Sequence, residues 1–202
     1  MVKYKIVGES MTELFAADIK NIDLTDETCS LVSPERRKRI ERMTSEAGKK
    51  LCLAAGLLIS RVIGAPELVT DKGKPYAEGK SSFSISHSGD IAVLAVSAQP
   101  VGIDIEKRAD RDIIKLAARA FHEDEQKRLK SAQDKKREFF KIWTMKESLV
   151  KAWGTGFDRE PSSFSVFDDN GFNFFVREYA QGYTLCVCTK DRDINDIIFL
   201  EF

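Results

Sequence analysis

The sequence predicts an α+β fold made of two similar halves, with a ligand cleft between them. Stretches with a β pattern return after each group of helical stretches, and no low-complexity tract or linker separates the groups. With 202 residues, 43% of them hydrophobic, the chain can bury a sizeable core. We expect an N-terminal half at residues 1–105 and a C-terminal half at residues 106–202, related by a pseudo-two-fold axis. The repeat is one of architecture, because the two halves show no clear residue-level similarity.

In the first half, two helices are expected between strands. A strand is predicted at residues 4–7, followed by a variable segment up to Ser30. A helix begins after Ser33, because serine caps a helix, Pro34 suits its first turn and the acidic Glu35 suits its positive end. A second helix at residues 45–63 carries an apolar stripe on one face and ends at Gly64. Strands are then predicted at residues 83–86, 91–96 and 101–106.

The second half is also expected to contain helices followed by strands. Helices are predicted at residues 111–121, 123–130 and 136–153. Strands follow at residues 164–167, 172–178, 183–189 and 197–202, and the Asp-Asn-Gly turn at residues 169–171 separates the first two.

Composition limits the partners and the compartment. The 32 basic and 32 acidic residues cancel, so a general nucleic-acid binder is not expected. Basic clusters at residues 36–39 and 135–137 could bind a phosphate or an acidic protein, or form a solvated helix face. No stretch is long and apolar enough for a signal peptide or a membrane span, and the four cysteines contain no C-x-x-C pair. We therefore expect reduced cysteines, no membrane association and a cytoplasmic location.

Two acidic residues stand on one face of the predicted strand at residues 101–106. A period of two directs Asp104 and Glu106 to one side and Ile103 and Ile105 to the core. Two ionised carboxylates aimed at one point repel each other, so they need a cation. Hard oxygen ligands suit Mg²⁺, which keeps coordination positions for water and phosphate. A solvated strand face is the alternative interpretation of this pair.

The predicted helix at residues 136–153 carries an acid and a base on one face. Trp143, Glu147 and Lys151 are four residues apart and therefore lie along the same side. An aromatic beside an ion pair indicates a site, although a tryptophan more often belongs to a core. Residues 72–76 and 86–89 add a basic turn and a polar strand end. Taken alone, His87 is more often a structural group than a functional one.

Four segments in this order resemble the 4′-phosphopantetheinyl transferases. They are Lys74-Pro75, the segment at residues 83–88, the acidic segment at 102–106 and the segment at 143–151 of the predicted helix. The resemblance runs from about Ser33 to Gly156, and the chain length points to the long, single-chain type, expected to be a monomer. It implies transfer of the phosphopantetheine arm of coenzyme A, the co-substrate, to a serine of an apo acyl or peptidyl carrier protein. Mg²⁺ or Mn²⁺ would assist, and adenosine 3′,5′-bisphosphate would be released.

The resemblance also implies a role for individual residues. Asp104, Glu106 and Glu147 would hold the metal, and Glu147 and Lys151 would be catalytic. Coenzyme A would be bound by Arg36, Arg39, Lys74, Pro75, Ser86, His87, Asp104 and Lys151. The carrier-protein groove would contain Ile113, Leu116, Leu129, Lys135, Lys136 and Arg137. Many members have an arginine where Lys49 and Lys50 stand here, and lysine offers a point charge instead of a fork.

Two other functions use the same residues. A metal-dependent nucleotide pyrophosphohydrolase would employ the carboxylates with water as the nucleophile and would need no carrier protein. A non-catalytic relative would bind coenzyme A or a carrier protein without turnover, although such a protein would be expected to lose one of the four residues Asp104, Glu106, Glu147 and Lys151.

Overall fold

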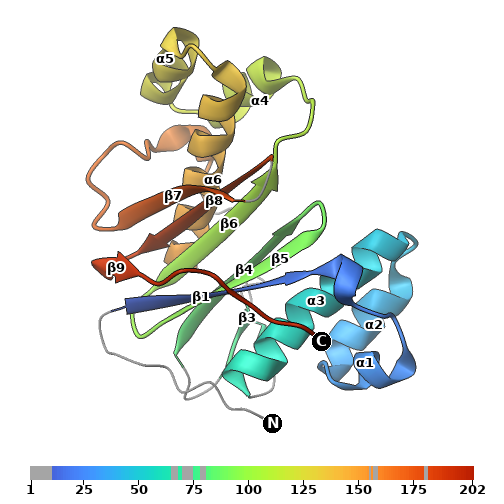
Figure 1. Ribbon diagram of the computed structural model, residues 1–202. Coiled ribbons are helices and arrows are strands. Elements are labelled where there is room, and N and C mark those ends of the chain that lie inside the picture. The colour runs from blue at the N-terminus through green and yellow to red at the C-terminus, as the bar shows by residue number, and fades with distance from the viewer. Residues whose placement is uncertain are drawn as a thin grey trace.

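The computed structural model describes residues 11–64, 68–69, 75–77, 81–154, 156, 159–179 and 182–202. Two sheets lie next to each other, each with a long helix against it (Figure 1). The first sheet has the order β10 (Ile198–Phe199), β1 (Met11–Asp18), β5 (Ile91–Ser97), β4 (Ser82–Ser88). The second has the order β6 (Val101–Lys107), β8 (Tyr183–Thr189), β7 (Asn173–Tyr179). The short strand β9 (Asp193–Ile194) also pairs with β1, and β2 (Leu68–Val69) pairs with β3 (Pro75–Tyr76).

Both halves repeat one connection, which confirms the predicted α+β class. In the first, β1 leads through α3 (Glu46–Ile63) to the hairpin β4–β5, and β5 lies between β1 and β4. In the second, β6 leads through α6 (Lys135–Trp153) to the hairpin β7–β8, and β8 lies between β6 and β7. The division at residues 105 and 106 stays a prediction. That boundary falls within β6, and strands β9 and β10 return to pair with the first half.

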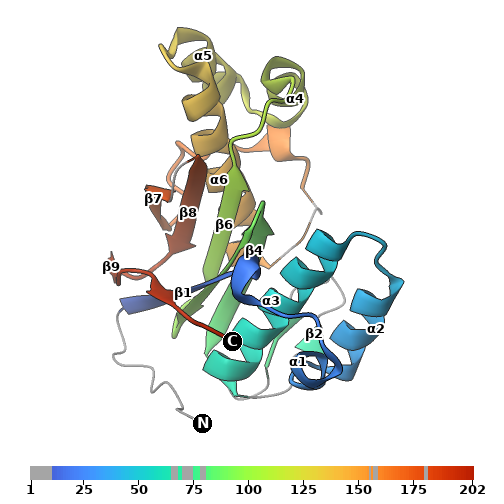
Figure 2. The ribbon, with the colours of Figure 1, turned by 45° about the vertical axis from the view of Figure 1, so that its right-hand side comes forward.

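The helices begin where capping residues predict. Ser33 caps α2 (Pro34–Arg42) by accepting a hydrogen bond from the Arg36 amide, and Ser45 caps α3 in the same way. Gly64 ends α3 in the left-handed conformation. The remaining helices are α1 (Asp26–Ser30), α4 (Ile113–Ala120) and α5 (Glu123–Ser131), with 3₁₀ turns at Ile19–Asn21 and Pro161–Ser163. In Figure 2, α1, α2 and α3 lie together on one side of the molecule, and α4 and α5 lie at the end of α6. Among the described residues, no helix is long and apolar enough to cross a membrane.

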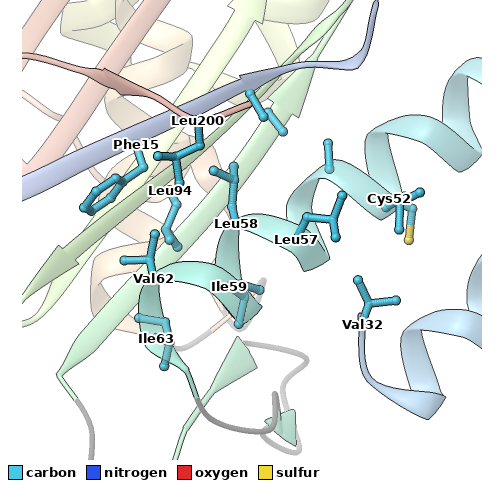
Figure 3. Packing of buried hydrophobic residues seen from close by; sticks show 14 of the residues in the cluster. Phe15, Val32, Cys52, Leu57, Leu58, Ile59, Val62, Ile63, Leu94 and Leu200 are labelled. Carbon is cyan, nitrogen blue, oxygen red and sulfur yellow. The ribbon is translucent and has the colours of Figure 1, made fainter. Parts of the chain in front are cut away.

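The core of the first half forms between α3 and its sheet. Leu58 and Val62 of α3 lie beside Leu94 of β5 and Phe15 of β1 (Figure 3). Phe15 and Leu94 are register partners in the antiparallel pair of β1 and β5, so one helix face covers both strands. This packing follows from the apolar stripe of α3.

The predicted secondary structure differs from the structure at residues 11–30 and at residues 164–167. The strand predicted at residues 4–7 lies outside the described residues. The variable segment contains both β1 and α1, which were not predicted. The strand predicted at residues 164–167 is wrong. Phe164 and Val166 are buried there, but the Phe164 carbonyl accepts from Lys146 Nζ, and the Val166 amide donates to Glu125 Oε1, instead of forming a ladder.

Candidate active site

The site is built where β6 and α6 touch. A side chain at Gly102 would place its Cβ 1.9 Å from the Ser148 carbonyl oxygen and 2.6 Å from the Ala152 nitrogen, which is impossible without a shift. Glycine therefore allows the backbones of strand and helix to meet. This contact sets the turn of α6 that carries Glu147 and Lys151 against the strand that carries Asp104 and Glu106.

Lys151 and Asp104 form the central ion pair. Lys151 Nζ lies 2.6 Å from Asp104 Oδ1 and also donates to Ser86 Oγ at 3.1 Å and to the Ile103 carbonyl at 3.2 Å. Ser86 Oγ in turn donates to Asp104 Oδ1 at 2.8 Å. The second carboxylate oxygen, Oδ2, is buried and accepts no hydrogen bond in the described part of the chain. A buried carboxylate oxygen without a partner is costly, so this atom is suited to a cation.

Glu106 is held from two sides. Ser88 Oγ donates to its Oε2 at 3.2 Å, and Arg111 Nη2 lies 3.2 Å from the same oxygen. Burial raises the pKa of Glu106, and the neighbouring Asp104 carboxylate raises it further, whereas Arg111 lowers it.

Glu147 completes the acidic group. Its side chain is half-buried and makes no hydrogen bond or ion pair within the described residues. Burial raises its pKa, as do the carboxylates of Asp104 and Glu106, while the ammonium of Lys151 acts in the opposite direction. An unengaged carboxylate of this kind is free to bind a cation or to accept a proton.

The three carboxylates suit a hard divalent cation by their chemistry. As they stand, no three acidic, histidine or cysteine side chains in the described ranges converge closely enough to enclose a metal ion. The Asp104 carboxylate, whose Oδ2 has no partner among the described residues, raises the pKa of both Glu106 and Glu147, so the three acids share one negative region around Asp104. Carboxylates with room for water and phosphate are what Mg²⁺ takes.

The residues predicted for coenzyme A are only partly brought together. His87 is solvent-accessible on β4, yet surrounding protein depletes its hydration, and this lowers its pKa. Lys151, Arg39 and Arg36 lower the pKa further, so these cations share one region. Arg36 itself is buried and donates to the Cys52 carbonyl at 3.0 Å, a bond that ties α2 to α3, while its role toward coenzyme A stays a prediction.

The other predicted positions differ in how far they are defined. Pro75 lies in β3 and is half-buried, and Arg39 is exposed on α2. Lys74 lies outside the described residues.

The predicted carrier-protein groove needs one correction. Leu129 is 2% exposed and belongs to the core of the second half, because it lies on the inner face of α5. Ile113 and Leu116 are half-buried against the same core, whereas Ile114 is 57% exposed. Lys135, Lys136 and Arg137 form the first turn of α6.

A groove of about 620 Å³ runs beside that turn, between α5, α6 and the strands β7 and β8. Arg128, Arg137 and Lys141 line it together with Glu138 and Glu178. Arg137 forms an ion pair with Glu178, and Lys136 forms one with Asp110.

A buried ion pair holds α6, the helix that carries Glu147 and Lys151, against α5. Lys146 Nζ lies 2.8 Å from Glu125 Oε2, and both side chains are almost fully buried. The pair ties α5 to α6 and to the segment at residues 164–166, since Lys146 also donates to Phe164 and Glu125 accepts from Val166. No individual role was predicted for Lys146, Ser88 or Arg111. For Ser88 a signal existed, because Ser84, Ser86 and Ser88 alternate in phase, as Asp104 and Glu106 do.

Comparisons with known proteins bear on the same region. Residues 100–197 match the family model described as the 4′-phosphopantetheinyl transferase superfamily. The chain is 44% identical over 139 residues to the 4′-phosphopantetheinyl transferase gsp of Aneurinibacillus migulanus, covering 62% of this chain but only 58% of that relative. It is 30% identical to the 4′-phosphopantetheinyl transferase Sfp of Bacillus subtilis strain 168, covering 84% of this chain and 87% of the relative. A further 4′-phosphopantetheinyl transferase of Bacillus subtilis is 32% identical, with 85% and 88% covered.

A solved structure also matches part of the chain. It is the holo-[acyl-carrier-protein] synthase of Thermotoga maritima, with 19% identity and a TM-score of 0.35, covering 46% of this chain and 64% of that one. A likeness at this level carries no argument about the site.

Proposed function

Because this chain belongs to the 4′-phosphopantetheinyl transferase superfamily, in its long single-chain type, we propose which reaction its site performs. The 4′-phosphopantetheine arm moves from coenzyme A to a serine hydroxyl of an apo acyl or peptidyl carrier protein. Adenosine 3′,5′-bisphosphate leaves. The reaction attacks one phosphorus of a pyrophosphate, so the site must balance phosphate charge and align the reacting groups.

One observation carries this proposal: β6 and α6 set three carboxylates beside one lysine. Asp104, Glu106 and Glu147 would hold Mg²⁺ or Mn²⁺, which would neutralise charge on the pyrophosphate and orient it. The unpartnered Oδ2 of Asp104 and the unengaged carboxylate of Glu147 support this assignment. Without a cation, the Asp104 charge raises the pKa of Glu106 and Glu147, which is unfavourable for their ionised forms.

Glu147 is the candidate general base. Burial and the neighbouring carboxylates raise its pKa above that of an ordinary glutamate, which makes the ionised group a stronger base. The carrier serine would lose its proton to Glu147, directly or through water, while its oxygen forms the new bond to phosphorus. The bond from that phosphorus to the bridging oxygen breaks at the same time.

Lys151 is the candidate partner of the leaving phosphate. Its ammonium is already placed beside Asp104 and Ser86, so it would stabilise the charge that develops on the bridging oxygen or protonate it. His87, Arg36 and Arg39 would hold the 3′-phosphate, and Ser86 and Pro75 would line the nucleotide site. Lys74 belongs to the same proposed set.

The carrier protein would dock on the basic turn that begins α6. Carrier proteins present an acidic helix beside their serine, and Lys135, Lys136 and Arg137 offer the opposite charge. Ile114, exposed on α4, offers an apolar contact on the same half. The cytosol, where cysteines stay reduced, is the proposed compartment, and all four cysteines are free thiols.

Intact-mass analysis of an apo carrier protein tests the function. Incubation with the enzyme, coenzyme A and Mg²⁺ should add one phosphopantetheine arm to the carrier. The gain should disappear with a chelator and in Glu147→Gln. Cleavage of coenzyme A without carrier would support the pyrophosphohydrolase instead. Binding of coenzyme A with no transfer to several acyl and peptidyl carriers would indicate a non-catalytic protein.

A further inference from the structure

Serine side chains join the two sheets where β4 runs beside β6. The two strands belong to different sheets, yet every second backbone amide of β6 donates a hydrogen bond to a serine at every second position of β4. Ile103 donates to Ser84 Oγ at 3.1 Å, Ile105 to Ser86 Oγ at 3.4 Å and Lys107 to Ser88 Oγ at 3.0 Å. We call Ser84, Ser86 and Ser88 the serine ladder.

The ladder also directs protons toward the acidic residues. A hydroxyl has one proton and two acceptor positions, so accepting from an amide leaves its proton available. Ser86 donates that proton to Asp104, and Ser88 donates its proton to Glu106 Oε2 at 3.2 Å. In each case the amide acceptor bond fixes the hydroxyl, and the fixed hydroxyl then holds the carboxylate of the preceding residue on β6.

The first rung lacks a carboxylate. By the same register Ser84 stands opposite Gly102, which has no side chain, so Ser84 joins the sheets without touching an acid. Ser84 can therefore serve as a control for Ser88, because Ser84 only joins the sheets, whereas Ser88 also donates to an acidic side chain.

We propose that Ser88 is a positioning residue, which aims Glu106 at the metal site. This inference rests on the proposed metal-dependent transfer. Arg111 also contacts Glu106, but its side chain is 39% exposed on a loop, whereas Ser88 is anchored by the Lys107 amide. Groups that orient metal ligands commonly affect metal affinity by about 10- to 100-fold when removed.

A measurement of Mn²⁺ binding in the presence of coenzyme A tests the proposal without turnover. Binding is monitored as the loss of the electron paramagnetic resonance signal of the free ion. Ser88→Ala should weaken Mn²⁺ binding by about tenfold. Ser84→Ala should leave it unchanged, although this variant also loses one bond between the sheets and, because that bond is more deeply buried, should lose at least as much stability in urea. Ser88→Thr keeps the hydroxyl and should restore binding. Ser86 is a poorer test because it also contacts Lys151.

Kinetics should agree with the binding result. In Ser88→Ala, the Mg²⁺ concentration for half-maximal rate should rise by a similar factor, with the KM for coenzyme A unchanged. Equal Mn²⁺ affinity in Ser88→Ala and wild type would overturn the positioning role and leave the metal proposal standing. Equal weakening of Mn²⁺ binding in Ser84→Ala and Ser88→Ala would also overturn it, because the effect would then come from the loss of a hydrogen bond between the two sheets. A wild-type enzyme that binds no Mn²⁺ and resists chelator would overturn both proposals.

Discussion

Glu147 lowers the stability of the metal-free fold in its ionised form, the form that the proposed reaction requires. Its carboxylate is half-buried near Asp104 and Glu106, and its pKa is raised from the ordinary value of 4.5. A carboxyl group with a raised pKa in the folded state binds its proton more tightly there than in the unfolded chain. Its contribution to stability is therefore lost as the pH rises from 4.5 through the raised pKa. Above the raised pKa, the metal-free fold carries the full penalty of the charged form.

Glu147→Gln should stabilise the metal-free protein while abolishing transfer. The amide removes the charge and keeps the shape, so we expect a gain of about 0.5–2 kcal/mol in the free energy of unfolding at neutral pH. Urea denaturation at several pH values measures it, and the gain should vanish below pH 4.5, where the glutamate is protonated in both states. A variant that is less stable at neutral pH would show that Glu147 has a structural partner.

His87 should make coenzyme A binding depend on pH. Burial and the nearby Lys151 hold its pKa below the ordinary 6.5, so the imidazole is neutral in the free enzyme at neutral pH. A phosphate favours the charged imidazole, and therefore the KM for coenzyme A should fall as the pH is lowered toward this pKa.

Comparison with His87→Gln isolates this effect, because the phosphate titrates near pH 6 as well. The variant should lose the part of the dependence that belongs to the imidazole, with little change in kcat. Identical pH profiles for the KM of the two enzymes would remove His87 from the phosphate site.

At the scale of elements, the contact between β6 and α6 sets the geometry of the site. Gly102→Ala would press a methyl group into the backbone at Ser148, so the helix must shift away from the strand. We expect a loss of about 1–3 kcal/mol in the free energy of unfolding. The loss of activity should be larger than partial unfolding explains, because Glu147 and Lys151 move with the helix.

Gly48→Ala is the matched control. Gly48 lies in α3, where an added Cβ would meet its nearest atom at an ordinary 3.6 Å. Alanine favours helix, so this variant should be as stable as the wild type or slightly more stable. Thermal denaturation together with kcat separates the two variants, and full activity in a folded Gly102→Ala protein would contradict the argument.

The elements also show what the sequence could and could not predict. Helix α2 was predicted because Ser33 caps it locally, and helix α3 was predicted because of its apolar stripe and its end at Gly64. The strand β1 was missed because its identity depends on pairing with β5 far along the chain. The pairs Asp104 with Glu106 and Glu147 with Lys151 followed from the periodicities of strand and helix.

Features that depend on how elements pack were not predictable in this way. The contact of Ser88 with Glu106 needs the register between two sheets, and the Lys146–Glu125 pair needs the packing of α5 on α6. Leu129 was assigned to the carrier-protein groove by the resemblance to the family, whereas its face of α5 is turned to the core. No local pattern contains this information.

At the scale of the whole molecule, charge should govern recognition of the carrier protein. Replacing Lys135, Lys136 and Arg137 by glutamate should raise the KM for an acidic carrier protein and leave that for coenzyme A unchanged. The internal ion pairs of Lys136 and Arg137 are exposed, so their loss should cost little stability. Steady-state kinetics with each substrate varied in turn measures this.

Lys20→Glu provides a charge control in the first half, since its side chain is 70% exposed. It should change neither KM. The effect of the triple replacement should shrink at high salt, because screening weakens attraction between exposed charges. Unchanged kinetics for the carrier at low salt would place the docking surface elsewhere.

The pairing of β1 with β9 and β10 has a consequence for synthesis of the chain. Met11 pairs with Asp193 and Phe15 with Ile198. One edge of β1 therefore stays unpaired until the ribosome has synthesised residues near the end of the given sequence. Until then that edge presents unpaired amides and carbonyls beside apolar side chains, which is a template for association with other nascent chains. A chain that stops before residue 193 should therefore be lost to aggregation, even though Asp104, Glu106, Glu147 and Lys151 have all been made.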